Sequence, residues 1–194
     1  MLKFITDFGD TAYLLPGAMV ILGYLVYRRA FPSAIAWATA LIACATLTAL
    51  LKVGFLTCGA KVRSLDVYTP SGHTSIATFF YLSVGLLVSR NRTPWSVAAI
   101  MTLAGGLAAA IAASRGILQV HTVGEVVVGS LIGTVSVIWF ASRYYRAPQL
   151  GLPLTPVLGL LATLALIAHG QHLSRESWFN IAADYLRSHF AVCA

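Results

Sequence analysis

The sequence predicts an all-α fold: a polytopic membrane helical bundle of about six transmembrane helices, followed by a C-terminal amphipathic helix. Of the 194 residues, 58% are hydrophobic and only 10% are charged, and the mean hydropathy is +0.81. A soluble domain carries roughly 25% charged residues, so this composition is that of a membrane protein. Residues 169–194 instead alternate between polar and apolar side chains in a helical rhythm. The length leaves no room for a second domain, and we expect residues 1–194 to form one membrane domain.

The expected spans are apolar stretches separated by short polar gaps. Their lengths approach the roughly 20 residues needed to cross a bilayer. They cover about residues 11–27, 33–51, 74–88, 95–113, 122–140 and 153–168. The first residues contain Lys3, Asp7 and Asp10 rather than a basic segment with a cleavage site, so no cleavable signal peptide is expected. The first span is expected to serve as an uncleaved insertion signal.

The arginines predict the orientation of the bundle. The net charge of +7 could suggest nucleic acid, but no basic patch with interleaved aromatic residues is present, and we discount nucleic acid as a partner. Three pairs of arginines lie in gaps after alternate spans, which marks those gaps as cytoplasmic. They are the pairs Arg28 and Arg29, Arg90 and Arg92, and Arg143 and Arg146. The remaining gaps would then face outward.

Four cations lie on the predicted outer side, against this bias, and indicate an anionic ligand there. They are Lys52, Lys61, Arg63 and Arg115. Arg115 offers a planar fork for phosphate oxygens and Lys52 a point charge, and Ser114 precedes Arg115 at the end of the fourth span. Taken singly, Lys52 and Arg115 could equally be interfacial anchors for lipid headgroups. Together on one side they favour a phosphate-binding site.

His121 and Glu125 are four residues apart at the start of the fifth span, so they share one helix face. A carboxylate that accepts a proton from one imidazole nitrogen leaves the other nitrogen free to attack. The alternative is a buried pair that only stabilises the bundle. Ionisable groups within membrane segments are costly, and this favours a functional pair.

The tetrapeptide Pro70-Ser71-Gly72-His73 precedes the third span and is typical of a helix start. Glycine lets a ligand approach the backbone closely, and the exposed amides of a helix N-terminus bind anions. His73 would stand beside that anion, where it could protonate a leaving oxygen. Alone the tetrapeptide is ordinary turn chemistry, and its meaning comes from the second cluster at Ser114, Arg115 and His121.

With these two motifs the chain resembles the type-2 phosphatidic acid phosphatase superfamily, which includes vanadium haloperoxidases and bacterial undecaprenyl-diphosphate and lipid A phosphatases. That pattern has a Lys followed by Arg-Pro, then Pro-Ser-Gly-His, then Ser-Arg with a His six residues on and an Asp four beyond. The match covers about residues 52–133. Glu125 replaces the usual Asp. Lys52 fits the first motif, but Arg-Pro is absent, and Arg63, with Lys61 as the alternative, is the candidate for the missing arginine.

The resemblance implies an integral membrane lipid phosphate or diphosphate phosphatase that is metal-independent and needs no cofactor. His121 would attack phosphorus to give a phosphohistidine, Glu125 would steady the imidazole, and His73 would protonate the leaving group. The phosphoryl oxygens would be held by Lys52, Arg63, Ser71, Gly72, Ser114 and Arg115. The sequence does not separate lipid candidates such as undecaprenyl diphosphate, phosphatidylglycerol phosphate, phosphatidic acid or lipid A. A zinc set from the histidines and Glu125 lacks the short ligand spacing of such sites.

Two other functions stay open at this point. A lipid hydroxyl rather than water could accept the phosphoryl group, which would make the protein a phosphotransferase. The altered first motif and Glu125 also fit a non-catalytic lipid-binding or transport relative, although the retained histidines and Arg115 argue against it. We expect a bacterial inner-membrane protein whose active site faces the periplasm or exterior, with membrane lipids as its surroundings and an oligomeric state that the sequence leaves undetermined.

The tail and the cysteines complete the expectations. Ser174 would cap an amphipathic helix on the outer leaflet, with Trp178, Ala182, Tyr185 and Phe190 near one side; the alternative is a frayed tail. Cys44 would pack within the second span. Cys58 and Cys193 both fall on the predicted outer side, where a disulfide between them could persist.

Overall fold

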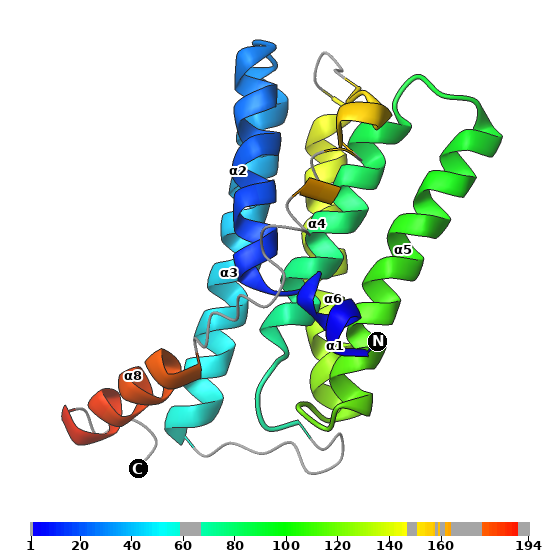
Figure 1. Cartoon of the computed structure of the whole chain (residues 1–194). Coiled ribbons are helices and arrows are strands. Elements are labelled where there is room, and N and C mark those ends of the chain that lie inside the picture. Colours follow the sequence, from blue (N-terminus) through cyan, green and yellow to red (C-terminus); the bar gives the residue numbers. More distant parts are fainter. Residues whose placement is uncertain are drawn as a thin grey trace.

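The structure is a computed structural model, and it describes residues 2–58, 67–146, 151–157, 159, 162–163 and 176–189. All of the major elements are α-helices, arranged as a bundle with one helix at its edge (Figure 1). They are α1 (Leu2–Asp7), α2 (Thr11–Tyr27), α3 (Phe31–Cys58), α4 (Gly72–Ser89), α5 (Pro94–Ile117), α6 (Val123–Tyr144) and α8 (Glu176–His189). The prediction of an all-α fold is confirmed.

Four of the described helices are long and apolar enough to cross a membrane: α3, α4, α5 and α6. They identify an integral membrane protein, but the prediction of about six spans is corrected to four. The first expected span coincides with α2, which has only 17 residues and, at about 1.5 Å per residue, falls short of a bilayer core about 30 Å thick. Asp10 caps its start and the chain turns at Arg29, where φ is 54°, so neither end can extend. Half of the sixth expected span, 153–168, lies outside the described residues.

Helix α4 occupies the centre of the bundle, and it contacts α2, α3, α5 and α6. Its polar side chains are buried against neighbouring helices instead of facing lipid. Ser83 Oγ accepts a hydrogen bond from Trp37 Nε1 of α3 at 2.9 Å, and the hydroxyls of Ser75 and Thr48 lie 2.9 Å apart. Because these groups find partners inside the bundle, α4 can be less apolar than a helix exposed to lipid.

Helices α4 and α6 approach closely, and the approach depends on two glycines one turn apart. A Cβ atom on Gly129 would lie 2.6 Å from Ser71 O, and one on Gly133 would lie 2.5 Å from Ser75 O. Small residues at this spacing let helix backbones approach in membranes. The contact brings the start of α4 against the first turns of α6, where the candidate site lies.

The N-terminal segment packs against the same end of the bundle. Gly9 lies against α5, since a Cβ there would meet Ile111 Cγ2 at 2.6 Å, and Tyr81 of α4 donates a hydrogen bond to Phe8 O at 2.8 Å. Asp10 follows and caps α2 by accepting from Ala12 N at 2.8 Å. This packing places Asp10 beside the start of α4.

Helix α8 lies beside the C-terminal end of α3 (Figure 1). The side chain of Arg187 donates from Nε to Thr57 O at 2.9 Å and from an η nitrogen to Leu56 O, so it satisfies carbonyls that the end of α3 leaves without helical partners. A helix in the tail is therefore confirmed, although Ser174 and Phe190 lie outside the described residues. Trp178, Ala182 and Tyr185 are exposed.

Two of the three cysteines fall in the described part of the chain. Cys44 is free and buried within α3, as the sequence predicts. Cys58, the last residue of α3, is disulfide-bonded. Its expected partner, Cys193, lies outside the described residues.

Candidate active site

The candidate site lies at one end of the bundle, where α4 begins, α5 ends and α6 begins. Ser71, Gly72 and His73 stand at the start of α4, Ser114 and Arg115 in the last turn of α5, and His121 in the turn before α6. That turn is held by the carbonyl of Arg115, which accepts from Val120 N at 3.1 Å and from His121 N at 3.3 Å. The same backbone contact thus fixes His121 relative to Arg115.

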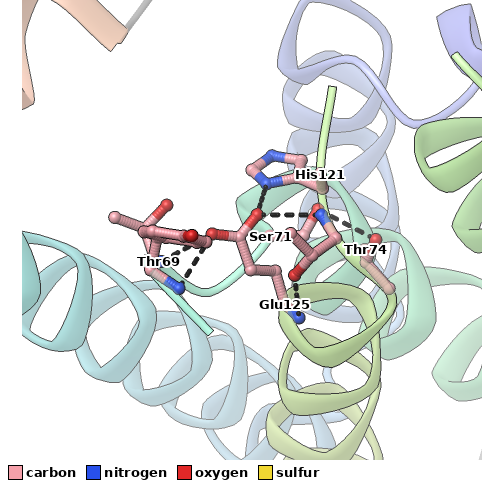
Figure 2. A network of polar contacts seen from close by, with 7 residues as sticks. Thr69, Ser71, Thr74, His121 and Glu125 are labelled. Carbon is pink, nitrogen blue, oxygen red and sulfur yellow. Dashed lines mark hydrogen bonds and ion pairs between the residues drawn. The ribbon is translucent and has the colours of Figure 1, made fainter. Parts of the chain in front are cut away.

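His121 and Glu125 form a buried hydrogen-bonded pair, as their spacing predicts. The distance from His121 Nδ1 to Glu125 Oε2 is 2.7 Å, and the two residues are 8% and 5% exposed (Figure 2). Because a carboxylate accepts, Nδ1 carries the proton and Nε2 keeps its lone pair. The longer arm of glutamate, compared with aspartate, does not prevent the contact.

The Glu125 carboxylate also accepts hydrogen bonds from three backbone amides, and these hold it in place. Thr69 N donates to Oε1 at 2.7 Å and Tyr68 N at 3.2 Å, while Thr122 N donates to Oε2 at 3.2 Å (Figure 2). In return the Thr122 hydroxyl accepts from Glu125 N at 3.2 Å, which completes a capping box at the start of α6. The spacing Thr122-x-x-Glu125 carries this signal in the sequence, whereas the contacts from Tyr68 and Thr69 arise only in the folded chain.

The surroundings of His121 favour its neutral form. Burial lowers the pKa of His121 below its ordinary value; the Glu125 carboxylate opposes this, and the positive charges of Arg115 and Lys52 add to the lowering. The net result is an imidazole that is neutral near pH 7. A neutral imidazole with a fixed tautomer is the form that can act as a nucleophile.

Ser71 and Gly72 form the start of α4 against α6. Ser71 is fully buried; its amide donates to Glu125 O at 3.2 Å, and its hydroxyl accepts from Thr74 Oγ1 at 3.0 Å (Figure 2). A Cβ atom on Gly72 would meet only Thr48 Cγ2, at 4.0 Å. The protein's own packing therefore does not require glycine at this position.

His73 lies on the next position of α4 and faces an acidic partner that the motifs do not contain. Its Nε2 is 3.5 Å from Asp10 Oδ2, and its side chain is 28% exposed while that of Asp10 is 10% exposed. Sequence reasoning missed Asp10, because its approach to His73 depends on the packing of the N-terminal segment.

The expected phosphate ligands divide into three groups. Lys52 and Arg115 are 8% and 9% exposed. Both lie close enough to His121 for their positive charges to lower its pKa. The sequence predicts Lys52 at the end of a span, but it lies within α3. Its Nζ is 5.3 Å from the ring centroid of Phe179 in α8. The hydroxyl of Ser114 donates to Ile111 O at 2.7 Å and lies 3.0 Å from Thr6 Oγ1, so it contacts α5 and α1.

The remaining candidates, Arg63 and Lys61, lie outside the described residues. His121 and Glu125 line an open pocket of about 530 Å³ together with Tyr68, Gly116, Gln119, Val120, Thr122 and Val123. Within the part of the chain that the structure describes, no three His, Cys, Asp or Glu side chains gather where they could hold a metal ion.

Comparisons with known proteins identify one family and one relative of the chain. The family described as the PAP2 superfamily matches residues 55–149, which include His73, Arg115, His121 and Glu125. The chain is also 30% identical over 150 residues to a protein of Klebsiella pneumoniae described as an uncharacterized 22.5 kDa protein in the cps region, covering 76% of this chain and 71% of that protein. No solved structure matches the chain.

Proposed function

Because the chain belongs to the PAP2 superfamily, we propose that it is a membrane phosphatase that hydrolyses a lipid phosphate or diphosphate through a histidine nucleophile. The observation that carries the proposal is the hydrogen bond of 2.7 Å between His121 Nδ1 and Glu125 Oε2. It leaves Nε2 available for attack, and the amide of Thr69, 2.7 Å from the same carboxylate, fixes the pair. A buried pair with no chemical role would not need the cations Lys52 and Arg115 beside it.

In the proposed reaction, His121 Nε2 attacks phosphorus, the P–N bond forms and the bond from phosphorus to the leaving oxygen breaks. His73 donates a proton to that oxygen, and the lipid leaves as an alcohol or monophosphate. Water then attacks the phosphohistidine and gives a proton to His73, and the P–N bond breaks. Inorganic phosphate leaves, and neutral His121 and protonated His73 are regenerated. Charge on the phosphoryl oxygens would be stabilised by Lys52, Arg115 and the amides at the start of α4.

Asp10 enters this scheme as a positioning residue for His73. The Asp10 carboxylate lies 3.5 Å from His73 Nε2, where it limits the rotation of the imidazole ring. Among the sequence-derived candidates, Ser71 would act through its place at the helix start, because its hydroxyl already accepts from Thr74. Ser114 would act by packing α5 against α1, and a direct role for Arg63 stays a prediction.

Phosphate release by the purified protein tests the proposal. The assay uses detergent micelles with a chelator present and compares phosphatidic acid, phosphatidylglycerol phosphate, undecaprenyl diphosphate and lipid A. We expect His121→Ala to abolish release, since the nucleophile is lost, whereas His189→Ala on the exposed face of α8 should release phosphate as the wild type does. Equal release by His121→Ala would overturn the proposed mechanism. Phosphorylated product formed from an added lipid alcohol, without free phosphate, would indicate the phosphotransferase instead.

A further inference from the structure

A second polar pocket lies at the opposite end of the bundle from the candidate active site, where α2 and α4 end and α5 begins. These helix ends are at the top of Figure 1. It has a volume of about 470 Å³ and is lined by Arg28 after α2, by the turn Arg90-Asn91-Arg92 between α4 and α5, and by Gly151 to Pro153. We call it the arginine pocket. Three arginines from two different turns thus line one cavity.

Contacts with the protein hold these arginines in place. Arg28 donates from an η nitrogen to Tyr24 Oη at 2.9 Å, and Arg92 donates from Nε to Val88 O at 2.9 Å. Arg90 stacks over the ring of Tyr145 at 5.4 Å, and its Nε is buried with no hydrogen-bond partner among the described residues. Each guanidinium carries five N–H donors, so these contacts leave most of them for something else.

Among the residues that the structure describes, no carboxylate lines this pocket. Its six acidic residues are Asp7, Asp10, Asp66, Glu125, Glu176 and Asp184. None of them belongs to the turns that line the cavity, and the described ones lie in the N-terminal segment, in the first turn of α6 and in α8. The described lining of the pocket thus supplies positive charge and no counter-charge, which suits an anion from outside the chain. Guanidinium forks match the oxygens of a phosphate group, which they bind through paired hydrogen bonds.

We propose that the arginine pocket binds a phosphate group, carried by an anionic phospholipid headgroup or present as a soluble phosphate. The pocket lies where α4 ends and α5 begins, both of which are candidate spans, so a headgroup at the membrane surface is within its reach. This site would be separate from the one that contains His121, and it does not depend on the proposed reaction.

The chain offers a matched control for the test. Arg28, Arg90 and Arg92 line the pocket, whereas Arg29, Arg143 and Arg146 lie at the same end of the bundle and do not line it. Changing either set to glutamine removes the same charge. Binding is measured on the purified full-length protein in detergent, by thermal unfolding and native mass spectrometry, with phosphatidylglycerol, phosphatidylcholine or inorganic phosphate added.

We expect phosphatidylglycerol, but not phosphatidylcholine, to stabilise the wild type and the Arg29/Arg143/Arg146 variant. The Arg28/Arg90/Arg92 variant should bind it about tenfold more weakly or worse, because charge-assisted hydrogen bonds are lost. Pocket-dependent binding of inorganic phosphate without lipid would support the soluble source. Equal loss in both triple variants, or no binding in any arm, would overturn the proposal. Arg90→Lys, which keeps the charge and lacks the planar guanidinium, provides a milder variant should the triple variant not fold. If Arg90→Lys binds phosphatidylglycerol as the wild type does, that result would also count against the pocket.

Discussion

Glu125 has three structural tasks at once. It closes the capping box of α6 with Thr122, and it accepts hydrogen bonds from the amides of Tyr68 and Thr69 in the segment before α4. It also accepts a hydrogen bond from His121 Nδ1. The first and third are local in sequence, and the second connects two helices. One carboxylate therefore sets both the helix start and the tautomer of the proposed nucleophile, so the geometry of the site depends on the packing of α4 against α6.

The pH dependence of the reaction follows from the charge state of His121. Attack requires the neutral imidazole, and burial lowers the pKa of His121 below its ordinary value near 6.5, so the acid limb of kcat/KM should lie below pH 6.5. Glu125→Gln removes the group that raises the pKa of His121. We therefore expect this variant to be slower and its acid limb to move further down. The comparison uses one substrate for both proteins, so that titration of the substrate cancels, and a limb that moves up in Glu125→Gln would contradict the assignment.

Asp10 offers a test of the proposed acid that leaves the helix cap intact. Asparagine caps a helix as well as aspartate does, so Asp10→Asn should keep the contact with Ala12 N and lose only the charge facing His73. We expect its rate to fall, by part of the about 10²–10⁴-fold that general acids contribute, for lipid phosphates with alkyl leaving groups. Aryl phosphates, whose leaving groups need no proton, should react nearly as in the wild type. An equal loss for both substrate types would point to a structural role alone.

A substitution at Gly72 distinguishes a role in ligand approach from a role in protein packing. A methyl group at this position would meet only Thr48 Cγ2 at 4.0 Å, so Gly72→Ala should fold and melt like the wild type. If phosphate approaches the helix start there, the methyl group displaces it, and a shift of about 1 Å can cost about 10²-fold in rate. Thermal unfolding and steady-state phosphate release on the same preparation give the answer. A fully active Gly72→Ala variant would remove the start of α4 from the proposed phosphate site.

At the level of helices, the sequence predicts existence and type well and the ends less well. The apolar stretches 33–51 and 95–113 correspond to α3 and α5, but both helices are longer, ending at Cys58 and Ile117. The spans predicted from hydropathy end just before Lys52 and Ser114, because hydropathy measures transfer to lipid and not helix formation. Those residues remain helical since they are buried within the bundle, where Lys52 and Ser114 are 8% and 0% exposed.

The central position of α4 could not have been predicted from its composition. The sequence shows a short and moderately polar stretch, and the polar side chains that weaken its hydropathy are those that Trp37 and Thr48 contact. The pair of His121 and Glu125 was predictable because both residues lie on one turn. Asp10 and the amide of Thr69 were not, because each reaches the site through contacts between segments distant in sequence.

The crossing of α4 and α6 should be the least tolerant of added volume. A Cβ on Gly133 would lie 2.5 Å from Ser75 O and 2.7 Å from Thr78 Cβ, so Gly133→Ala must separate the helices and should cost about 1–3 kcal/mol. Gly106→Ala in α5 is the control, because nothing lies within 4 Å of its Cβ position. Thermal unfolding in detergent should show a lower Tm for Gly133→Ala only. Unchanged stability would mean that the two helices are not in this contact.

For the molecule as a whole, charge is divided between the two ends of the bundle. The arginines after α2, between α4 and α5 and at the end of α6 lie at one end, with no described carboxylate beside them. The candidate active site and the described acidic residues Asp7, Asp10, Glu125 and Asp184 lie at the other, as does Cys58, which is disulfide-bonded. Positively charged loops stay in the cytoplasm, and disulfides persist outside it, so both features favour an active site on the outer side.

Cysteines at the two ends of α5 test this orientation. Trp95 is 87% exposed at the start of the helix, and Val120 is 46% exposed in the turn after it. Of the described cysteines, Cys44 is buried and Cys58 is disulfide-bonded, and the wild type labelled in parallel gives the background. On intact spheroplasts we expect a membrane-impermeant maleimide to label Val120→Cys at once and Trp95→Cys only after permeabilisation. The reverse pattern would place His121 in the cytoplasm. There the positive loops would face outward against the usual bias, and a disulfide at Cys58 would have to form in a reducing compartment; both costs disappear only when the site faces outward.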